Sequence, residues 1–287
     1  MSTAMSAAMT SVIALGRGAR WQQRLDGVPP LAWLAVHAAA LWPHWGWAAA
    51  RVADGSDDPL GLAALTALLF FVASAAPRLR ATPRGGWMLA SLALTAGATA
   101  AVFALPPLVG ALLAALALAC SLHAYMPAGQ PLLAHAGLAV LALPLLSSLQ
   151  FYAGYPLRLI TAEASTWALQ FAGVAAERAG TAMLVHGQWV IVDAPCSGVQ
   201  MVWMAYFCAF CVAAYAGLRD GVLLRRLPAV GALVLAGNVL RNTVLVVLQT
   251  RAQAVPEWVH EGTGLAILAL VCAATLRVIH GGRDATR

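Results

Sequence analysis

The chain has 287 residues, of which 61% are hydrophobic and 10% are charged, and its mean hydropathy is +0.78. This composition excludes an ordinary soluble domain, because apolar runs of about 20 residues recur and each can cross about 30 Å of hydrocarbon. The formal net charge of +6 does not indicate a nucleic-acid partner. The chain has no lysine, and its arginines lie between the apolar runs, where they orient a membrane protein.

Residues 1–29 contain Arg17, Arg20 and Arg24 and precede the first apolar run. They show no apolar stretch with a small-residue cleavage site, so we expect a cytoplasmic leader. The sequence predicts an all-α, polytopic transmembrane bundle of about eight spans, in a single integral membrane domain over residues 1–287. The expected spans are residues 30–50, 59–76, 87–104, 106–126, 132–150, 197–218, 227–250 and 262–279. Only Pro106-Pro107 separates the third span from the fourth.

The arginines predict the orientation of the bundle. With eight spans, the arginine groups of the leader, the second connection, the sixth connection and the C-terminal tail all fall on one side. The positive-inside rule makes that side the cytoplasm, together with both termini. The opposite side receives the acidic loop at residues 54–58 and the long segment before the sixth span. We therefore expect residues 151–195 to form a small cap on the outer face.

Two kinds of structure are expected within this cap. Residues 156–178 can form an amphipathic helix, with Leu157, Ile160 and Leu169 among its apolar contacts. Residues 181–192 have the pattern of a β-hairpin, because two β-prone stretches flank His186-Gly187, a pair suited to a tight turn. An ordinary loop is the alternative for this second stretch.

Cys196 lies where the polar, turn-rich end of the cap meets the sixth apolar run. A thiol at a helix start lies near unpaired backbone N–H groups and the positive end of the helix dipole, and both favour the nucleophilic thiolate. Asp193 or Ser197 can cap this helix. The alternative is that Cys196 is only a small residue at a helix start. We refer to residues 196–262 as the predicted catalytic segment.

Arg241 lies inside the seventh span, with Asn238 and Asn242 on the same helix face. An arginine in a membrane helix costs about 2.5–3.5 kcal/mol on insertion scales, so this face should point inward to a partner or a wet cavity. A position ten residues before Arg251 would lie about 15 Å below the outer end of a straight helix. A tilted helix, a recessed site or a helix end near Gln249 would bring Arg241 to Cys196. An ion pair or a carbonyl clamp is the structural alternative.

His260 lies in the short outer connection before the eighth span. A histidine there can exchange protons near neutral pH, and Glu257 or Glu261 can orient it. A lone interfacial histidine without a catalytic role is the alternative, and His186 is the competing histidine on the outer face.

Cys208 and Cys211 form a Cys-x-x-Cys pair in the middle of the sixth span, where packing is the simplest explanation. The sequence contains no metal-ligand pattern and no cofactor motif, so we expect neither a metal nor a cofactor. Two other functions stay open. A membrane thiol oxidoreductase would use Cys208 and Cys211, and a non-catalytic transporter or assembly subunit would line its substrate path with Arg241.

Taken together, Pro195-Cys196-Ser197-Gly198 at a helix start, Asn238-Val239-Leu240-Arg241 in the next span and His260 before the following one resemble the exosortase/archaeosortase family of membrane transpeptidases. The likeness covers roughly the C-terminal half of the chain. It implies Cys196 as nucleophile, Arg241 as an electrostatic or substrate-positioning group and His260 as proton carrier. Asn238, Ser197, Asp193, Glu261 and Gln200 would be supporting residues.

The resemblance also implies substrates, partners and location. Family substrates carry a C-terminal sorting signal, which consists of a short Pro-Glu-Pro-like motif, a transmembrane helix and a basic tail. The enzyme would cut near the motif and pass the acyl group to water or to a lipid or polysaccharide acceptor, as an enzyme of exopolysaccharide-producing bacteria. The active site would lie at the periplasmic face of the inner membrane. Gln200 departs from the family, since many exosortases have an arginine at this position, and this leaves the recognised motif open.

Overall fold

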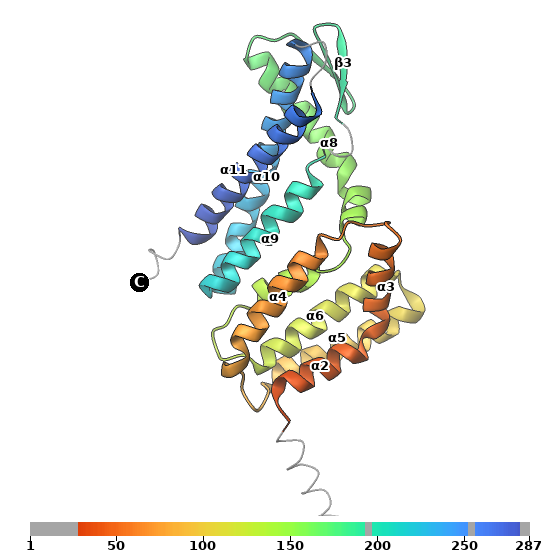
Figure 1. The fold of residues 1–287 in the computed structure, drawn as a ribbon, viewed down its shortest axis with the longest axis vertical. Coiled ribbons are helices and arrows are strands. Elements are labelled where there is room, and N and C mark those ends of the chain that lie inside the picture. Colours follow the sequence, from red (N-terminus) through yellow and green to blue (C-terminus); the bar gives the residue numbers. More distant parts are fainter. Residues whose placement is uncertain (1–27, 193–196, 252–255, 282–287) are drawn as a thin grey trace, which may run out of the picture. The chain divides into compact units, whose positions relative to one another are not determined.

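The computed structural model describes residues 28–192, 197–251 and 256–281, and we make no statement about the side chains of Arg251 and Glu257. The described residues are mostly helical, with one small β-sheet (Figure 1). The chain divides into two compact units, Met1–Trp45 with Val72–Ala128 and Gly46–Phe71 with Gly129–Arg287. The predicted single integral domain stays a prediction.

The structure confirms a helical transmembrane bundle. Among the described residues, six helices are long and apolar enough to cross a membrane, and a seventh span is added if one bent helix pair crosses once. The six are Gly61–Arg78, Gly85–Ala104, Pro107–Tyr125, Val199–Ala216, Asp220–Thr250 and Trp258–His280. About eight spans were expected, and two of the expected spans account for the difference.

The first expected span, residues 30–50, is broken into α2 (Pro30–Ala40) and α3 (Trp42–Ala53). Pro43 lacks the N–H group that a continuous helix would need there. The 11 residues of α2 reach only about 16 Å. The fifth expected span is α7 (Leu132–Leu141) followed by α8 (Leu146–Phe171), which meet at 96° around Pro144.

The first unit is built around the hairpin of α5 (Gly85–Ala104) and α6 (Pro107–Tyr125), and the predicted division at Pro106-Pro107 is correct. Small residues such as Ala98, Ala114 and Ala117 are buried between its helices, where they permit close approach. The Ser91 hydroxyl donates to the carbonyl oxygen of Ala117 at 2.8 Å. This hydrogen bond joins α5 to α6. A short 3₁₀ turn, η1 (Ala76–Arg78), precedes α5.

The second unit contains α4 (Gly61–Ala75), α7, α8, α9 (Val199–Ala216), α10 (Asp220–Arg251) and α11 (Glu257–His280). Helices α9, α10 and α11 pack on one another. Gly237 permits this, because a Cβ atom there would lie 2.3 Å from Val271 Cγ2 on α11. The Asp220 carboxylate accepts hydrogen bonds from the first backbone N–H groups of α7, at Leu132 and Leu133. The core of the unit includes Leu138, Trp203, Leu223, Val230, Val271 and Ile279.

A three-stranded antiparallel sheet follows α8, with strands β1 (Ala176–Ala179), β2 (Ala182–Val185) and β3 (Gln188–Ile191). The predicted hairpin at His186-Gly187 is confirmed, and both turn residues have positive φ angles of 50° and 79°. Such angles belong to the two-residue turns that match strand twist. Met183 and Val185 face a core shared with Leu169 of α8 and Val246 of α10.

The boundaries predicted for the amphipathic helix, residues 156–178, were wrong. Helix α8 begins ten residues earlier, at Leu146, and ends at Phe171, while Arg178 lies in β1. Gly173, at φ +77°, ends the helix, and the N–H of Val174 donates to the carbonyl of Leu169. This is a Schellman termination, in which glycine takes the left-handed conformation.

Candidate functional site

The start of α9 packs directly on α10. Gly198 has a φ angle of +85°, and a Cβ atom there would lie 2.8 Å from Asn238 Cγ. The 18 residues of α9 span about 27 Å, as does the stretch of α10 from Asp220 to Asn238. Helix α10 then continues about 20 Å beyond Asn238. Arg241 therefore lies only one turn beyond the level at which α9 starts.

This arrangement answers the question of how deep Arg241 lies. Helix α10 does not end near Gln249 but continues to Arg251, so the early helix end is wrong. The site is instead recessed relative to the end of α10, because α9 is much shorter than α10.

Arg241 and His260 come together from α10 and α11. The distance from Arg241 Nη2 to His260 Nε2 is 3.5 Å, and both side chains are half-buried. His260 lies in the first turn of α11, since this helix begins at Glu257 rather than near residue 262. Gly264 lies one turn further, where a Cβ atom would be 3.2 Å from Arg241 Nε. The missing side chain at Gly264 leaves room for the guanidinium against α11.

The electrostatics of this pair favour an anion. Two basic side chains meet beside the N-terminal end of α11, where the helix dipole adds about half a unit of positive charge. A carboxylate or a developing oxyanion would find the Arg241 guanidinium and the positive end of α11 at this place.

Asn238 joins three parts of the site. Its side chain is only 2% exposed, and its Nδ2 donates to Thr161 Oγ1 of α8 at 2.9 Å. Asn242 Nδ2 donates to the carbonyl of Asn238 at 2.9 Å, and Ser165 Oγ donates to the carbonyl of Val239. The predicted polar face of this helix is indeed buried, and it packs against α8 and the start of α9.

Ser197 is buried and bridges α8 to the start of α9. Its hydroxyl donates to Gln150 Oε1 at 2.8 Å and accepts the N–H of Val199 at 3.3 Å. The helix begins at Val199 rather than at Cys196, because Gly198 takes a left-handed conformation that a right-handed helix excludes. Cys196 and Asp193 lie outside the described residues, so their placement stays a prediction.

A family model described as transmembrane exosortase matches residues 52–277. The chain belongs to the transmembrane exosortase family. Neither the comparison with curated proteins nor the comparison with solved structures finds a match. The matched range includes every residue named in the site above, and with the apolar helices it makes the chain a multi-pass membrane enzyme of the exosortase type.

The remaining predicted residues of this exosortase lie at the edge of the site. Glu261 follows His260 on α11 and is exposed, and Gln200 is exposed in the first turn of α9. Gln200 lines a cavity of about 290 Å³. The other residues around this cavity are Asp58, Leu146, Ser147, Gln150, Ser197 and Val199. His186, the competing histidine, lies exposed in the β2–β3 turn.

Sequence reasoning missed the contributions of α8 to the exosortase site. Gln150 reaches Ser197 because Gly154 leaves space, and a Cβ atom at position 154 would lie 2.8 Å from Gln150 Nε2. Thr161 and Ser165 are one helical turn apart and contact α10. The available signal was this row of polar residues at helical spacing, but it was assigned to a surface helix.

The cysteine pair expected in the sixth span is arranged differently from a redox motif. The Cys208 thiol contacts that of Cys272 on α11, with a sulfur–sulfur distance of 3.8 Å. Cys211 instead lines an apolar groove with Leu62, Phe70 and Phe71 of α4. Among the described residues no group of three or more His, Cys, Asp or Glu side chains is placed to hold a metal ion.

Proposed function

We propose that this exosortase is a cysteine transpeptidase or protease that cleaves the C-terminal sorting signal of exported proteins. Cys196 is the nucleophile in this proposal. The observation that carries it is the meeting of Arg241 and His260, with Arg241 one turn beyond the point where Gly198 packs on Asn238. Covalent geometry alone limits the distance between the Cα atoms of Cys196 and Gly198 to about 7 Å. This short separation along the chain supports a nucleophile near the level of the Arg241–His260 pair.

The proposed first step forms an acyl-enzyme. The Cys196 sulfur, after giving its proton to His260, bonds to the carbonyl carbon of the scissile peptide, and the carbonyl oxygen becomes an oxyanion. The guanidinium of Arg241 stabilises that oxyanion. The carbon–nitrogen bond then breaks, and His260 donates the proton to the leaving amine, which leaves a thioester on Cys196.

The second step returns the enzyme to its starting state. Water or an acceptor attacks the thioester carbon, the carbon–sulfur bond breaks and the sulfur recovers a proton. Water makes the enzyme a protease, whereas a lipid or polysaccharide acceptor makes it a transferase. We place this chemistry at the periplasmic face of a bacterial inner membrane. The substrates are proteins with a Pro-Glu-Pro-like motif, a transmembrane helix and a basic tail.

Arg241 has a second role open to it in this proposal. The positive charge of Arg241 and of the start of α11 also suits the carboxylate of an acidic motif residue. Gln200 carries no charge, so Arg241 would be the main cation for such a motif.

The test is cleavage of a tagged protein with a sorting signal from the same genome, followed by immunoblot. Wild type should shorten the substrate, and Cys196→Ala should leave it uncut. Cys208→Ser is the control, because the oxidoreductase alternative needs Cys208 and the proposal does not. Equal processing by wild type and Cys196→Ala would remove Cys196 as the nucleophile. In a transporter, Arg241→Ala would stop transport, whereas Cys196→Ala and Cys208→Ser would leave transport unchanged.

A further inference from the structure

A cavity of about 290 Å³ opens between the starts of two helices. Its walls come from the first turn of α8, the first turn of α9 and the loop before α4. Ser197 lines it, and Ser197 is bonded to Cys196. The cavity therefore reaches the residue that directly follows the proposed nucleophile in the chain. Among its described lining residues none is basic, and Asp58 is the one with a charged side chain.

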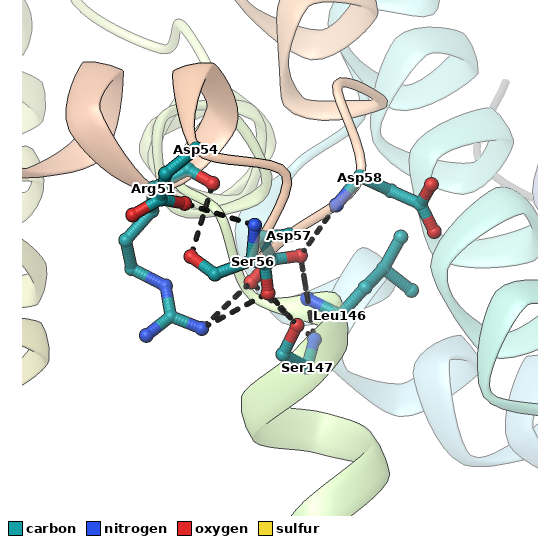
Figure 2. Close-up of polar contacts among 7 residues, drawn as sticks. All are labelled: Arg51, Asp54, Ser56, Asp57, Asp58, Leu146 and Ser147. Carbon is teal, nitrogen blue, oxygen red and sulfur yellow. Dashed lines mark hydrogen bonds and ion pairs between the residues drawn. The ribbon is translucent and has the colours of Figure 1, made fainter.

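Asp57 holds the loop that carries Asp58 (Figure 2). The Asp57 side chain accepts the backbone N–H groups of Leu146 and Ser147, at the start of α8, at 3.1 and 3.3 Å. It also forms an ion pair with Arg51 at 3.7 Å and accepts the N–H of Asp58 itself at 3.0 Å. Four groups thus fix the backbone of Asp58 relative to α8.

The Asp58 carboxylate points away from this network (Figure 2). It is exposed, and within the described part of the chain it makes no hydrogen bond or ion pair. Asp57 already neutralises the start of α8, and the start of α9 contributes about half a unit of positive charge. A full negative charge on Asp58 outweighs that half unit. The cavity is therefore negative on balance, opposite in sign to the Arg241–His260 pair.

We propose that this cavity is the acceptor subsite and that it takes a primary amine in its ammonium form, with Asp58 as the anionic anchor. This inference rests on the proposed function. The sorting signal brings its basic residues to the cytoplasmic side and an acidic motif to the outer side. A cation in an outer cavity beside the nucleophile therefore comes from the second reactant, which attacks the thioester.

The transfer step balances without a further reactant. The bound ammonium gives one proton to solvent through Asp58, and its nitrogen lone pair bonds to the thioester carbon. The carbon–sulfur bond breaks, and the second proton lost by the nitrogen goes to the Cys196 sulfur. The products are an amide, a free thiol and one released proton.

The first test measures how the thioester is divided between transfer and hydrolysis. The full-length enzyme is given its tagged substrate with either glycinamide or glycolamide, which differ only in an amine or a hydroxyl, and intact masses of the products are compared. Wild type should add glycinamide and not glycolamide. Asp58→Asn should lower the ratio of glycinamide product to hydrolysed product about tenfold while total cleavage stays within about twofold.

The matched control is Asp54→Asn, in the same loop. Asp54 is exposed, bonds the N–H of Ser56 and does not line the cavity, so its replacement should leave the ratio unchanged. An unchanged ratio in Asp58→Asn, or equal addition of glycolamide, would overturn the inference while the proposed function stands. Loss of cleavage in wild type would instead contradict the proposed function.

A second test does not depend on catalysis. In a Cys196→Ala chain, Gln200→Cys places a thiol in the cavity wall, and its labelling rate is compared for a cationic trimethylammonium-ethyl and an anionic sulfonato-ethyl methanethiosulfonate. The same chain without Gln200→Cys gives the background labelling rate of the other cysteines, and this rate is subtracted. The cationic reagent should react faster, and Asp58→Asn should lower the rate ratio about tenfold. An equal ratio with and without Asp58 would exclude a cation-binding cavity.

Discussion

The two ends of the α10–α11 pair use basic side chains in opposite ways. At one end, Arg226 Nη1 of α10 donates to the carbonyl of Ile279 at 2.7 Å, one residue before α11 ends. At the other end, Arg241 of the same helix meets His260 in the first turn of α11. A cation stabilises the C-terminal end of a helix by about 0.3–1 kcal/mol and is unfavourable at the N-terminal end. The first contact supports the fold, whereas the second places a cation near a helix N-terminus, which is the end of a helix that attracts anions.

Basic side chains also join neighbouring helices in the first unit. Arg84 donates to the carbonyl of His123 near the end of α6, and the ring of Trp87 packs edge-on against His123. His37 Nε2 lies 2.9 Å from Thr95 Oγ1. These polar groups join neighbouring helices, so a basic residue in this protein is not by itself evidence of a site.

The largest expected effect comes from removing the cation at the Arg241 end of the α10–α11 pair. Arg241→Gln should lower the rate of substrate cleavage by about 10²–10³-fold, because an oxyanion-stabilising donor is lost. Its Tm should change little, because Arg241 is only half-buried and glutamine can still donate a hydrogen bond at this position. Cleavage kinetics and thermal unfolding of the purified variant check the two results. A fall in Tm with normal cleavage would make Arg241 a structural residue.

Moving the guanidinium without removing it should have a smaller effect. Gly264→Val would push a side chain into the space beside Arg241 Nε and should lower cleavage about tenfold. Gly262→Val is the matched control, because no atom lies within 4 Å of a Cβ there. The same cleavage assay compares them. Equal losses in the two variants would point to a general effect of valine on the helix.

The Arg226 end of the α10–α11 pair should show the reverse result. Arg226→Gln should lower the free energy of unfolding by about 1 kcal/mol, since the charged hydrogen bond to Ile279 is lost at a helix C-terminus. Cleavage at a permissive temperature should stay unchanged. Thermal unfolding and cleavage of the same sample test this, and a loss of cleavage at full stability would remove the contrast between the two ends.

The smallest expected effect concerns Asn238, which lies one helical turn before Arg241 on α10. Asn238→Ala removes the hydrogen bond to Thr161 and should cost about 0.6 kcal/mol, the average for such bonds in a membrane bundle. Thr161→Val removes the same bond from the other side, so the double variant should cost less than the sum of the two. Strictly additive losses would show that Asn238 and Thr161 are not coupled.

The parts of the fold that were predictable depend on local chemistry. The turn at His186-Gly187 and the break at Pro106-Pro107 follow from backbone preferences of the residues themselves. Asp57 could not be assigned in this way, because it caps α8 from about 90 residues away. Gln150 has the same limitation, since its partner Ser197 lies 47 positions further along the chain.

The candidate site was predictable only in part for a related reason. The order of Cys196, Arg241 and His260 indicated a family, but the depth of Arg241 depended on how far α10 extends beyond α9. That difference depends on Gly198, whose left-handed conformation starts α9 at Val199 and whose missing side chain admits Asn238. Nothing in the local pattern distinguishes that glycine from one in an ordinary turn.

The central claim is that Cys196 forms a thioester with the help of Arg241. Its most direct test is mass spectrometry of enzyme quenched in acid during turnover, with and without hydroxylamine. The account predicts a hydroxylamine-sensitive acyl group on the peptide that contains Cys196, and a much smaller amount of it in Arg241→Gln. An acyl group on another cysteine, or the same amount on Cys196 with and without Arg241, would contradict the account.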